Sequence, residues 1–165
     1  MSSRFTRNTH CSYCGQPFAP KQAWPRTCAH CGHTSFLNPL PVVVMLVPVA
    51  GGVLAVRRAI EPGYGQLALP GGYLNIDETW QAAGTREVFE ETGVSIDPAG
   101  IREFAVRSTR DGSLLVFGLA GPLADLPPFQ YDAETAECLV LNAPAELAFP
   151  LHTEILAEYF HRAAR

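Results

Sequence analysis

The sequence predicts an α/β domain that follows a small cysteine-bearing segment. Two observations predict it: strand-like and helix-like patterns alternate along residues 37–165, and four of the five cysteines fall within residues 11–31. The chain has 165 residues, which suits one compact domain with an appendage. We therefore divide it into segment 1–36 and a domain spanning residues 37–165.

The composition excludes several classes of protein. Apolar residues make up 47% and charged residues 17%, which excludes a disordered chain. No apolar run approaches the roughly 18 residues needed to cross a bilayer, so no membrane partner is expected. The formal net charge of −4 argues against a nucleic-acid coat protein. Residues 1–10 lack the apolar stretch of a targeting segment, so we expect a cytoplasmic protein.

Four cysteines form two Cys-x-x-Cys pairs with thirteen residues between them. Such loops bring four thiolates around a tetrahedral ion. Disulfides are disfavoured in a cytosolic chain, and a redox pair needs only one copy. The spacing therefore predicts structural Zn²⁺ in a ribbon that has too few residues to fold by its own core. The predicted ligands are Cys11, Cys14, Cys28 and Cys31.

Strand-like patterns fill the start of the second segment. Residues 42–49 are β-branched and nearly all apolar, which is typical of a buried central strand. A glycine turn leads to a second strand over residues 53–57, and a short strand over 67–69 ends at Pro70-Gly71-Gly72. A helix is predicted over residues 78–92, with Asp77 as its cap, Glu78 in its first turn and Gly93 just beyond its end.

Three glutamates of this predicted helix share one side. Glu87, Glu90 and Glu91 fall within an arc of about 100° that also holds Trp80 and Ala83, so the carboxylates lie near the protein body. Clustered carboxylates repel one another and raise each other's pKa. Bound Mg²⁺ or Mn²⁺ would relieve this repulsion, because both ions prefer oxygen ligands. The alternative is a solvated acidic face.

The residues around these glutamates carry a motif. From Gly72 to Val94 the sequence resembles the Nudix box, G-x5-E-x7-R-E-U-x-E-E-x-G-U, at every fixed position. The resemblance implies an α/β/α sandwich with a mixed sheet and a hydrolase that uses Mg²⁺ or Mn²⁺ to cleave pyrophosphates. It implies that the metal ligands are Glu87, Glu90, Glu91 and the backbone carbonyl of Gly71, and that Glu78 and Arg86 orient the helix and its glutamates.

The general base that takes a proton from the attacking water is either a glutamate of the helix or an acid on a later loop. Glu134 and Glu137 are the candidates on a later loop, and the alternative is that both are ordinary surface acids. Arg57 and Arg58 end a strand, where one could meet a phosphate or stack on a base, or both could be exposed edge charges. Tyr73 lines the base pocket or belongs to the core.

The rest of the chain predicts scaffold. Asp111-Gly112 indicates a hairpin between residues 101–110 and 113–120. A proline-containing loop over 123–130, a strand over 137–141 and a short turn or helix from Pro144 follow. The closing helix covers residues 152–165 and faces inward with Ile155, Leu156, Tyr159 and Phe160.

The zinc ribbon joined to the Nudix box limits the resemblance to Nudix groups that also carry such a ribbon. Bacterial NADH pyrophosphatases carry a Ser-Gln-Pro-Trp-Pro-Phe-Pro-x-Ser array after the box, and residues 94–120 contain none of it. The chain is more similar to short zinc-ribbon Nudix hydrolases related to the plant FAD and ADP-ribose pyrophosphohydrolase. The similar stretches are Cys28-x-x-Cys31-Gly32, Asn38-Pro39, Val56-Arg57-Arg58, Leu69 to Leu74, Ala136-Glu137-Cys138 and Leu147-Ala148-Phe149.

That resemblance implies a nucleotide-derivative substrate, with FAD or ADP-ribose favoured, and AMP plus a phosphate ester as products. The alternatives are an NADH or NAD pyrophosphatase and a non-enzymatic module that senses nucleotides or binds nucleic acid. Nucleic-acid binding is not expected, because the ribbon has few aromatic residues and no dense basic run. A homodimer is expected only because Nudix proteins often dimerise.

Overall fold

The computed structural model describes residues 7–128 and 133–164. The chain divides into two compact units, Met1–Pro39 and Leu40–Arg165, three residues beyond the boundary expected from the sequence. The predicted loop at 123–130 is described as far as residue 128. No helix in the described part of the chain is long and apolar enough to cross a membrane.

The first unit is a small hairpin with a cysteine core. Its strands β1 (Arg26–Thr27) and β2 (Thr34–Ser35) pair in antiparallel fashion. Cys11, Cys28 and Phe18 are buried together, with Trp24 packed against them. So few apolar side chains give little hydrophobic stabilisation, which is typical of a unit that folds around a metal.

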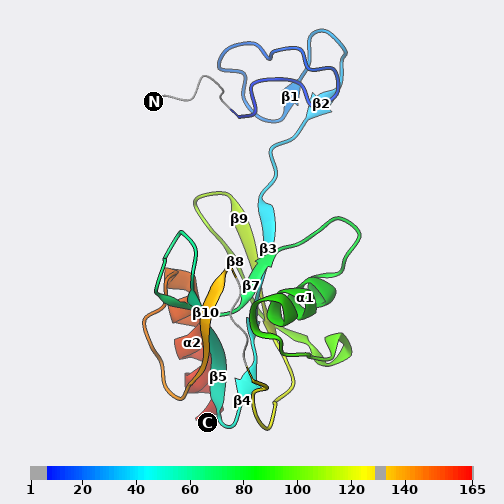
Figure 1. Ribbon diagram of the computed structural model, residues 1–165. Helices are drawn as coiled ribbons and strands as arrows, with labels where there is room; N and C mark the ends of the chain where they lie inside the picture. Colours follow the sequence, from blue (N-terminus) through cyan, green and yellow to red (C-terminus); the bar gives the residue numbers. More distant parts are fainter. Residues whose placement is uncertain (1–6, 129–132, 165) are drawn as a thin grey trace. The chain divides into compact units, whose positions relative to one another are not determined.

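The second unit contains two four-stranded sheets (Figure 1). The first sheet has the order β7-β3-β9-β8, in which β3 runs parallel to β9 and the other pairs are antiparallel. The predicted mixed sheet is therefore confirmed. Its strands are β3 (Leu40–Leu46), β7 (Gly71–Tyr73), β8 (Arg102–Ser108) and β9 (Ser113–Leu119).

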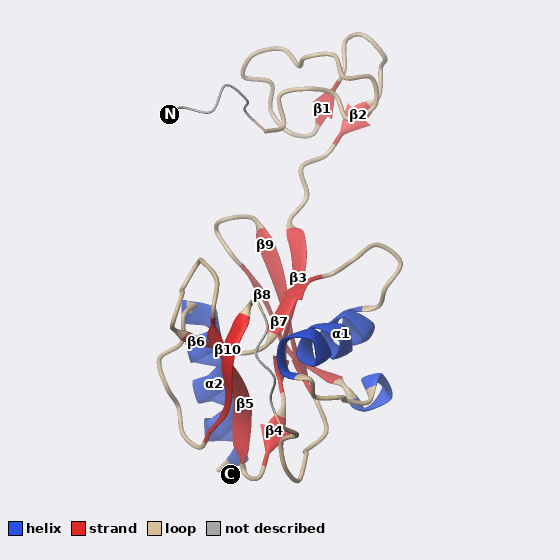
Figure 2. Ribbon diagram, in the orientation of Figure 1, coloured by secondary structure: helices blue, strands red, loops and turns tan. Residues whose placement is uncertain are grey.

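The second sheet has the order β10-β5-β4, and β6 pairs with β5 beside this path. Its strands are β4 (Pro48–Val49), β5 (Gly52–Arg58), β6 (Leu67–Ala68) and β10 (Thr135–Leu141). Two helices, α1 (Trp80–Thr92) and α2 (Pro150–Ala163), cover opposite sides of the strands, and a short helical turn spans Pro98–Gly100 (Figure 2).

Alternation along β3 explains why this strand is apolar on both faces. Val43 and Met45 belong to the core beneath α1, whereas Val44 and Leu46 belong to the core beneath α2. Successive side chains of a strand point to opposite faces, so a strand between two helix layers needs apolar residues throughout. The observed layers are those of the expected α/β/α sandwich.

The start of α1 corrects the predicted helix. Thr79, not Asp77, caps α1: its hydroxyl accepts a hydrogen bond of 3.2 Å from the Ala82 N–H. Asp77 has φ of 70°, a left-handed turn conformation that precedes the helix. Glu78 therefore lies before the first turn rather than in it. The predicted end is confirmed, because Gly93 is left-handed and donates its N–H to the Phe89 carbonyl.

Two other predictions need adjustment. The strand over 67–69 was expected to end at Pro70-Gly71-Gly72, but residues 71–73 form a further strand, β7, because two glycines allow the backbone to pair closely with β3. Pro144 lies in an irregular connection and starts no helix. The hairpin around Gly112 and the inward face of the closing helix are confirmed.

Candidate active site

The two glycines of β7 bring the strand close to both β3 and α1. A Cβ atom on Gly71 would lie 2.2 Å from the Val43 carbonyl oxygen, and one on Gly72 would lie 2.5 Å from the Glu87 carboxylate. Neither position tolerates a side chain without movement of its neighbour. The glycine pair thus creates the space in which Glu87 faces the strand.

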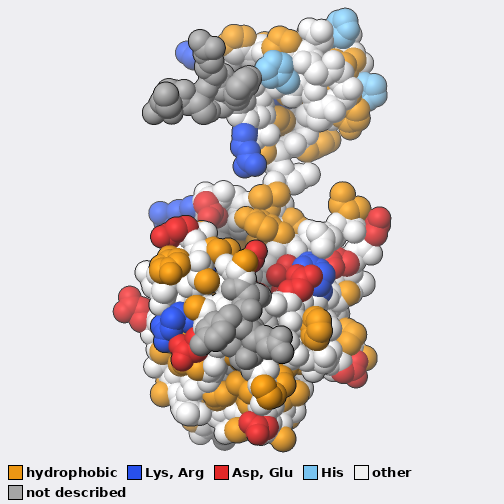
Figure 3. Space-filling view, in the orientation of Figure 1, with side chains coloured by type: hydrophobic (Ala, Val, Ile, Leu, Met, Phe, Trp, Pro, Cys, Tyr) orange, Lys and Arg blue, Asp and Glu red, His pale blue; other side chains and the backbone are white. Residues whose placement is uncertain are grey.

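Arg86 connects the carboxylates of this region. Its Nε and Nη2 donate to the two Glu78 oxygens at 3.2 and 2.8 Å, and Nη2 also donates to the Tyr73 carbonyl at 3.0 Å. Its Nη1 donates to Glu87 at 2.7 Å and to Glu90 at 3.0 Å. A guanidinium can hold several acceptors because its five donors are fixed in one plane. Figure 3 shows acidic side chains gathered around a basic patch over α1.

The same arginine sets the charge of its neighbours. Its hydrogen bonds hold the pKa of Glu78 below the usual range, so Glu78 stays ionised. The carboxylates in turn raise the pKa of Arg86, through its hydrogen bonds to Glu78 above all. Glu78 therefore acts as an anchor for the arginine, which holds the helix against β7.

Glu91 lies in a different environment. Its side chain is almost enclosed, with 9% of the residue exposed, and it accepts a 3.0 Å hydrogen bond from the Gly71 N–H. Burial above all, with a smaller contribution from the nearby Glu87 charge, raises the pKa of Glu91 to about 8. Burial also raises the pKa of Glu87. Both groups would become ionised more easily beside a cation.

The donor set fits a hydrated divalent cation. Among the residues that the structure describes, no three carboxylates converge as tightly as the four cysteines do. Glu90 is 57% exposed on its side chain and turned towards Arg86, whereas Glu91 is turned towards Gly71. Mg²⁺ keeps several waters and needs only one or two carboxylates. An all-oxygen set with mutual repulsion suits Mg²⁺ or Mn²⁺.

These carboxylates line one part of a pocket of about 1470 Å³. Small-molecule sites usually have volumes of roughly 300–1,000 Å³, so this pocket has room for an extended ligand. Glu87, Glu90 and Glu91 line it from α1 and Glu134 from the segment before β10, and two further acids, Asp111 and Glu154, also belong to the lining. Arg58, Phe149 and His152 line it from β5 and the start of α2.

The matched family agrees with this geometry. The NUDIX domain family matches residues 38–162, which is most of the chain. The chain belongs to the Nudix family. Its two-helix, mixed-sheet domain is the Nudix fold, and the segment from Gly72 to Val94 is the Nudix box of that domain.

Curated relatives of this Nudix domain include NAD-capped RNA hydrolases. The NAD-capped RNA hydrolase NudC of Edwardsiella ictaluri is 29% identical over 97 residues, which are 58% of this chain and 37% of that protein. NudC of Salmonella typhi matches with the same identity and coverage. The chain thus spans little more than a third of the length of these relatives.

Solved structures resemble the Nudix domain over a larger share of the chain. A NUDIX hydrolase from Nitrosomonas europaea superposes with a TM-score of 0.80 at 25% identity, covering 94% of this chain and 92% of that one. A bifunctional NMN adenylyltransferase/ADP ribose pyrophosphatase from Francisella tularensis was solved with AMP and a manganese ion. It has a TM-score of 0.60 at 25% identity and covers 77% of this chain and 42% of that one.

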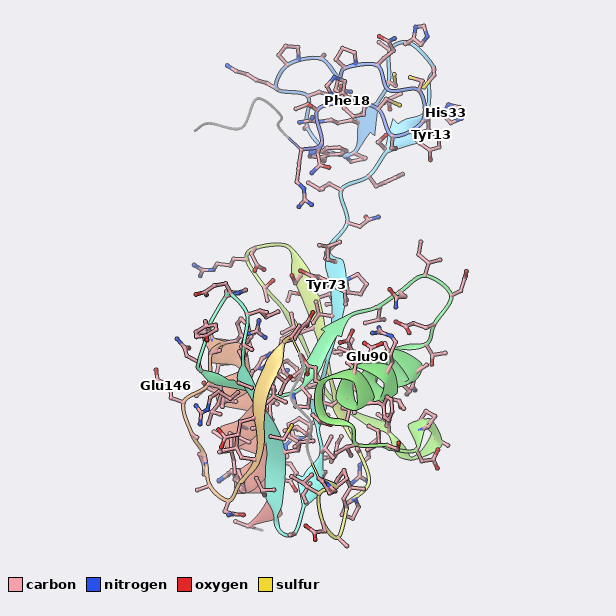
Figure 4. The ribbon with its side chains drawn as sticks, in the orientation of Figure 1. Tyr13, Phe18, His33, Tyr73, Glu90 and Glu146 are labelled. Carbon is pink, nitrogen blue, oxygen red and sulfur yellow. The ribbon has the colours of Figure 1, made fainter. Side chains whose placement is uncertain are left out.

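The Nudix pocket brings together most of the predicted site residues. Arg58, Gly71, Tyr73, Arg86 and the three helix glutamates line it, while Glu78 stands behind Arg86. Tyr73 is 60% exposed, so its side chain is not part of the core. Figure 4 labels Tyr73 on β7 and Glu90 on α1.

Besides Glu78, two predicted residues, Arg57 and Glu137, lie outside the pocket lining. Arg57 donates from Nε to Glu137 at 2.7 Å and from Nη1 to the Gly65 carbonyl at 3.1 Å. Glu134, the other loop candidate, lines the pocket, and its charge acts on both Glu87 and Glu91. The structure therefore separates two acids that the sequence could not rank.

Phe149 and His152 were missed by the sequence interpretation. The Arg58 guanidinium stacks 5.1 Å from the centroid of the Phe149 ring, and Arg58 Nε donates to the Pro62 carbonyl at 2.7 Å. Both aromatic residues lie more than fifty positions after the Nudix box, at the start of α2. The resemblance included Phe149 without giving it a role, and no spacing pattern connects either residue to the box, so their place in the pocket follows from the fold.

The four cysteines of the first unit have the geometry of a closed metal site. Their sulfurs lie within 4.8 Å of one another, and two Sγ–Sγ distances, Cys11–Cys31 and Cys14–Cys28, are 3.7 Å. A tetrahedral Zn²⁺ with Zn–S bonds of about 2.3 Å places its sulfurs about 3.8 Å apart. Backbone N–H groups lower the pKa of Cys11 and Cys28, which favours their thiolates, whereas desolvation and the neighbouring thiols raise the pKa of Cys14 as long as no cation offsets their charge. The residues therefore fit zinc.

Proposed function

We propose that this Nudix domain hydrolyses the pyrophosphate bond of a nucleoside-diphosphate-linked metabolite with the help of Mg²⁺ or Mn²⁺. FAD or ADP-ribose is favoured, and the products are AMP and a second phosphate ester. The observation that carries the proposal is the pocket itself, which places the box carboxylates and Arg58 around one large cavity. A diphosphate needs positive charge on both sides, and carboxylates alone would repel it.

In this proposal, Glu87, Glu90 and Glu91 hold the cation together with the Gly71 carbonyl. The bound cation would neutralise phosphate charge and lower the pKa of a water. Arg86 fixes the orientation of Glu87 and Glu90 through its Nη1, and the Gly71 N–H fixes Glu91. Water oxygen adds to one phosphorus, and the bridging oxygen leaves with the other phosphate.

Glu134 is better placed than Glu137 to take the proton of that water. Glu134 lines the pocket beside the box carboxylates, whereas Glu137 is tied to Arg57 outside it. A general base must lie within hydrogen-bond reach of the water or one water away. The proposal therefore assigns the loop role to Glu134 and gives Glu137 the task of anchoring Arg57.

The choice of substrate rests on the pocket and the relatives. A dinucleotide or ADP-ribose is long, which suits a pocket of about 1470 Å³. The Francisella tularensis relative is named an ADP ribose pyrophosphatase. The curated relatives are named NAD-capped RNA hydrolases, which favours NAD or NADH as the second candidate.

We further propose that the four thiolates bind Zn²⁺ and serve to fold the first unit.

A product analysis tests the proposal. The protein is incubated with Mg²⁺ or Mn²⁺ and, in separate reactions, FAD, ADP-ribose, NADH, CoA, nucleotide sugars and dinucleoside polyphosphates. Metal-dependent release of AMP from FAD or ADP-ribose is the expected result. Faster cleavage of NADH to AMP and reduced nicotinamide mononucleotide would favour the second candidate. No turnover of any compound, with a retarded RNA complex on a gel, would indicate a binding module instead.

A further inference from the structure

His152 is a buried polar side chain that the proposed chemistry leaves without a role. It lies in the first turn of α2 with 6% of its surface exposed, and it lines the pocket. The Phe149 and Phe117 rings flank it at centroid distances of 4.9 and 5.9 Å. A buried polar group in apolar surroundings is costly unless its hydrogen bonds are satisfied.

One nitrogen of the imidazole is occupied by the backbone. The Leu69 N–H donates to His152 Nδ1 at 3.3 Å, so Nδ1 carries no proton. A neutral imidazole with a bare Nδ1 must carry its hydrogen on Nε2. Burial and the positive charge of Arg58 lower the pKa of His152 to about 4, which keeps the ring neutral. The tautomer is therefore fixed by a main-chain bond.

The second nitrogen, Nε2, makes no hydrogen bond to residues 7–128 or 133–164. Among the hydrogen bonds of the described residues, the Leu69 bond is the one that His152 makes. His152 lines the pocket, and because Nδ1 is occupied by the backbone, the Nε2–H is the donor of this ring that is left for a ligand. A neutral donor beside Leu69, Leu115 and Phe149 suits an uncharged planar group better than a phosphate, which would lose its hydration there.

We propose that the Nε2–H of His152 donates a hydrogen bond to an uncharged acceptor on a heterocyclic ring of the substrate, on the α2 side of the pocket. This assignment rests on the proposed nucleotide hydrolysis and names its specificity contact. The acceptor is a carbonyl oxygen or an unprotonated ring nitrogen, either of the adenine or of the isoalloxazine of FAD. Arg58, held over the Phe149 ring, lines the same pocket.

Two substitutions separate the donor from the structural bond. In His152→Asn, the side-chain oxygen takes the place of Nδ1 and still accepts from Leu69, but no donor reaches the Nε2 position. In His152→Gln, the amide nitrogen reaches the Nε2 position, but the Leu69 acceptor is lost. Glu158→Gln, on the same helix and outside the pocket lining, is the matched control.

KM and kcat for ADP-ribose and FAD, calorimetric binding of AMP, and thermal midpoints are measured for all four proteins. For His152→Asn we expect KM to rise about tenfold at unchanged kcat, as the loss of one desolvated hydrogen bond predicts, with a thermal midpoint near that of the wild type. His152→Gln should keep KM within about twofold and lose stability. An unchanged KM in His152→Asn, or an equal rise in both variants, would overturn the assignment.

The AMP measurement identifies the ring and keeps the test independent of turnover. AMP contains adenine alone, so weaker AMP binding to His152→Asn places the acceptor on adenine. A weaker interaction with FAD alone places it on the isoalloxazine. If the wild type hydrolyses nothing, the proposed function fails, yet AMP binding still tests His152. Unaltered AMP and FAD affinities in His152→Asn would refute the contact itself.

Discussion

The Arg86 guanidinium donates two hydrogen bonds to the Glu78 carboxylate, from Nε at 3.2 Å and from Nη2 at 2.8 Å. Glu78 stands before α1 and Arg86 stands in its second turn, so the pair ties the chain entering the helix to the helix itself. The remaining donor of Arg86 reaches Glu87 and Glu90. This one pair thereby controls the position of two proposed metal ligands.

Replacing Arg86 should weaken metal binding even when the positive charge is kept. In Arg86→Lys the charge remains, but the planar fork that serves Glu78, Glu87 and Tyr73 is lost. We expect metal affinity or activity to fall roughly 10–100-fold, the usual cost of losing a group that orients metal ligands. Titration with Mn²⁺ and steady-state kinetics measure it. Arg107→Lys, which alters an ion pair outside the pocket, should behave like the wild type.

Substitution of the two glycines of β7 should affect different properties, stability for Gly71 and activity for Gly72. Gly71→Ala forces a Cβ against the β3 backbone, which cannot move aside, so we expect a loss of about 1–3 kcal/mol in the free energy of unfolding. Gly72→Ala meets the Glu87 carboxylate, a movable group, so the main loss should be in activity. Gly121→Ala has open space and should change neither. Equal behaviour of the two β7 variants in urea unfolding and kinetics would contradict this account.

The cysteine unit should contain one zinc ion per chain. Cys11→Ser/Cys28→Ser removes two thiolates of the cluster, so metal analysis should show loss of zinc and proteolysis should cut within residues 7–39. Cys138→Ala should retain the metal, because Cys138 lies in β10. Native protein without zinc would refute the assignment.

Burial of His152 predicts a specific dependence of stability on pH. Its pKa falls from an ordinary value of 6.5 to about 4 on folding, so between these values the unfolded chain binds a proton that the folded chain does not. The free energy of unfolding should therefore decrease as pH falls from 6.5 towards 4, by about 3 kcal/mol from this group. Glutamine does not titrate in this range, so His152→Gln lacks this loss. In urea unfolding, the free energy of unfolding of His152→Gln relative to that of the wild type should therefore rise by about 3 kcal/mol between pH 7 and pH 4. A constant difference across this range would show that His152 is not buried in its neutral form.

Local sequence patterns predicted the strands and helix ends that short runs of residues determine. Residues 42–49 are apolar because β3 and β4 pack on both faces, and Gly93 ends α1 because a left-handed residue was required there. The start of α1 was wrong by two residues because Asp77 and Thr79 are both good caps, and the chain turns at Asp77 before the helix begins.

The far side of the pocket could not be predicted in the same way. Glu134, Phe149 and His152 reach the box only through the pairing of β10 with β5 and the packing of α2. The sequence could not rank Glu134 over Glu137 either, because their positions differ through a register shift between Thr135 and Glu137. Such contacts depend on tertiary structure, which no motif encodes.

The box glutamates of α1 are proposed above to serve a metal-dependent hydrolysis. The most direct measurement is the rate of AMP release from ADP-ribose and FAD, with and without Mg²⁺ or Mn²⁺, by the wild type, Glu90→Gln and Glu91→Gln. We expect metal-dependent turnover in the wild type and a loss of about 10²–10⁴-fold in each variant, with circular dichroism showing that folding is retained. Near-wild-type rates in both variants, or turnover that chelation does not affect, would contradict it.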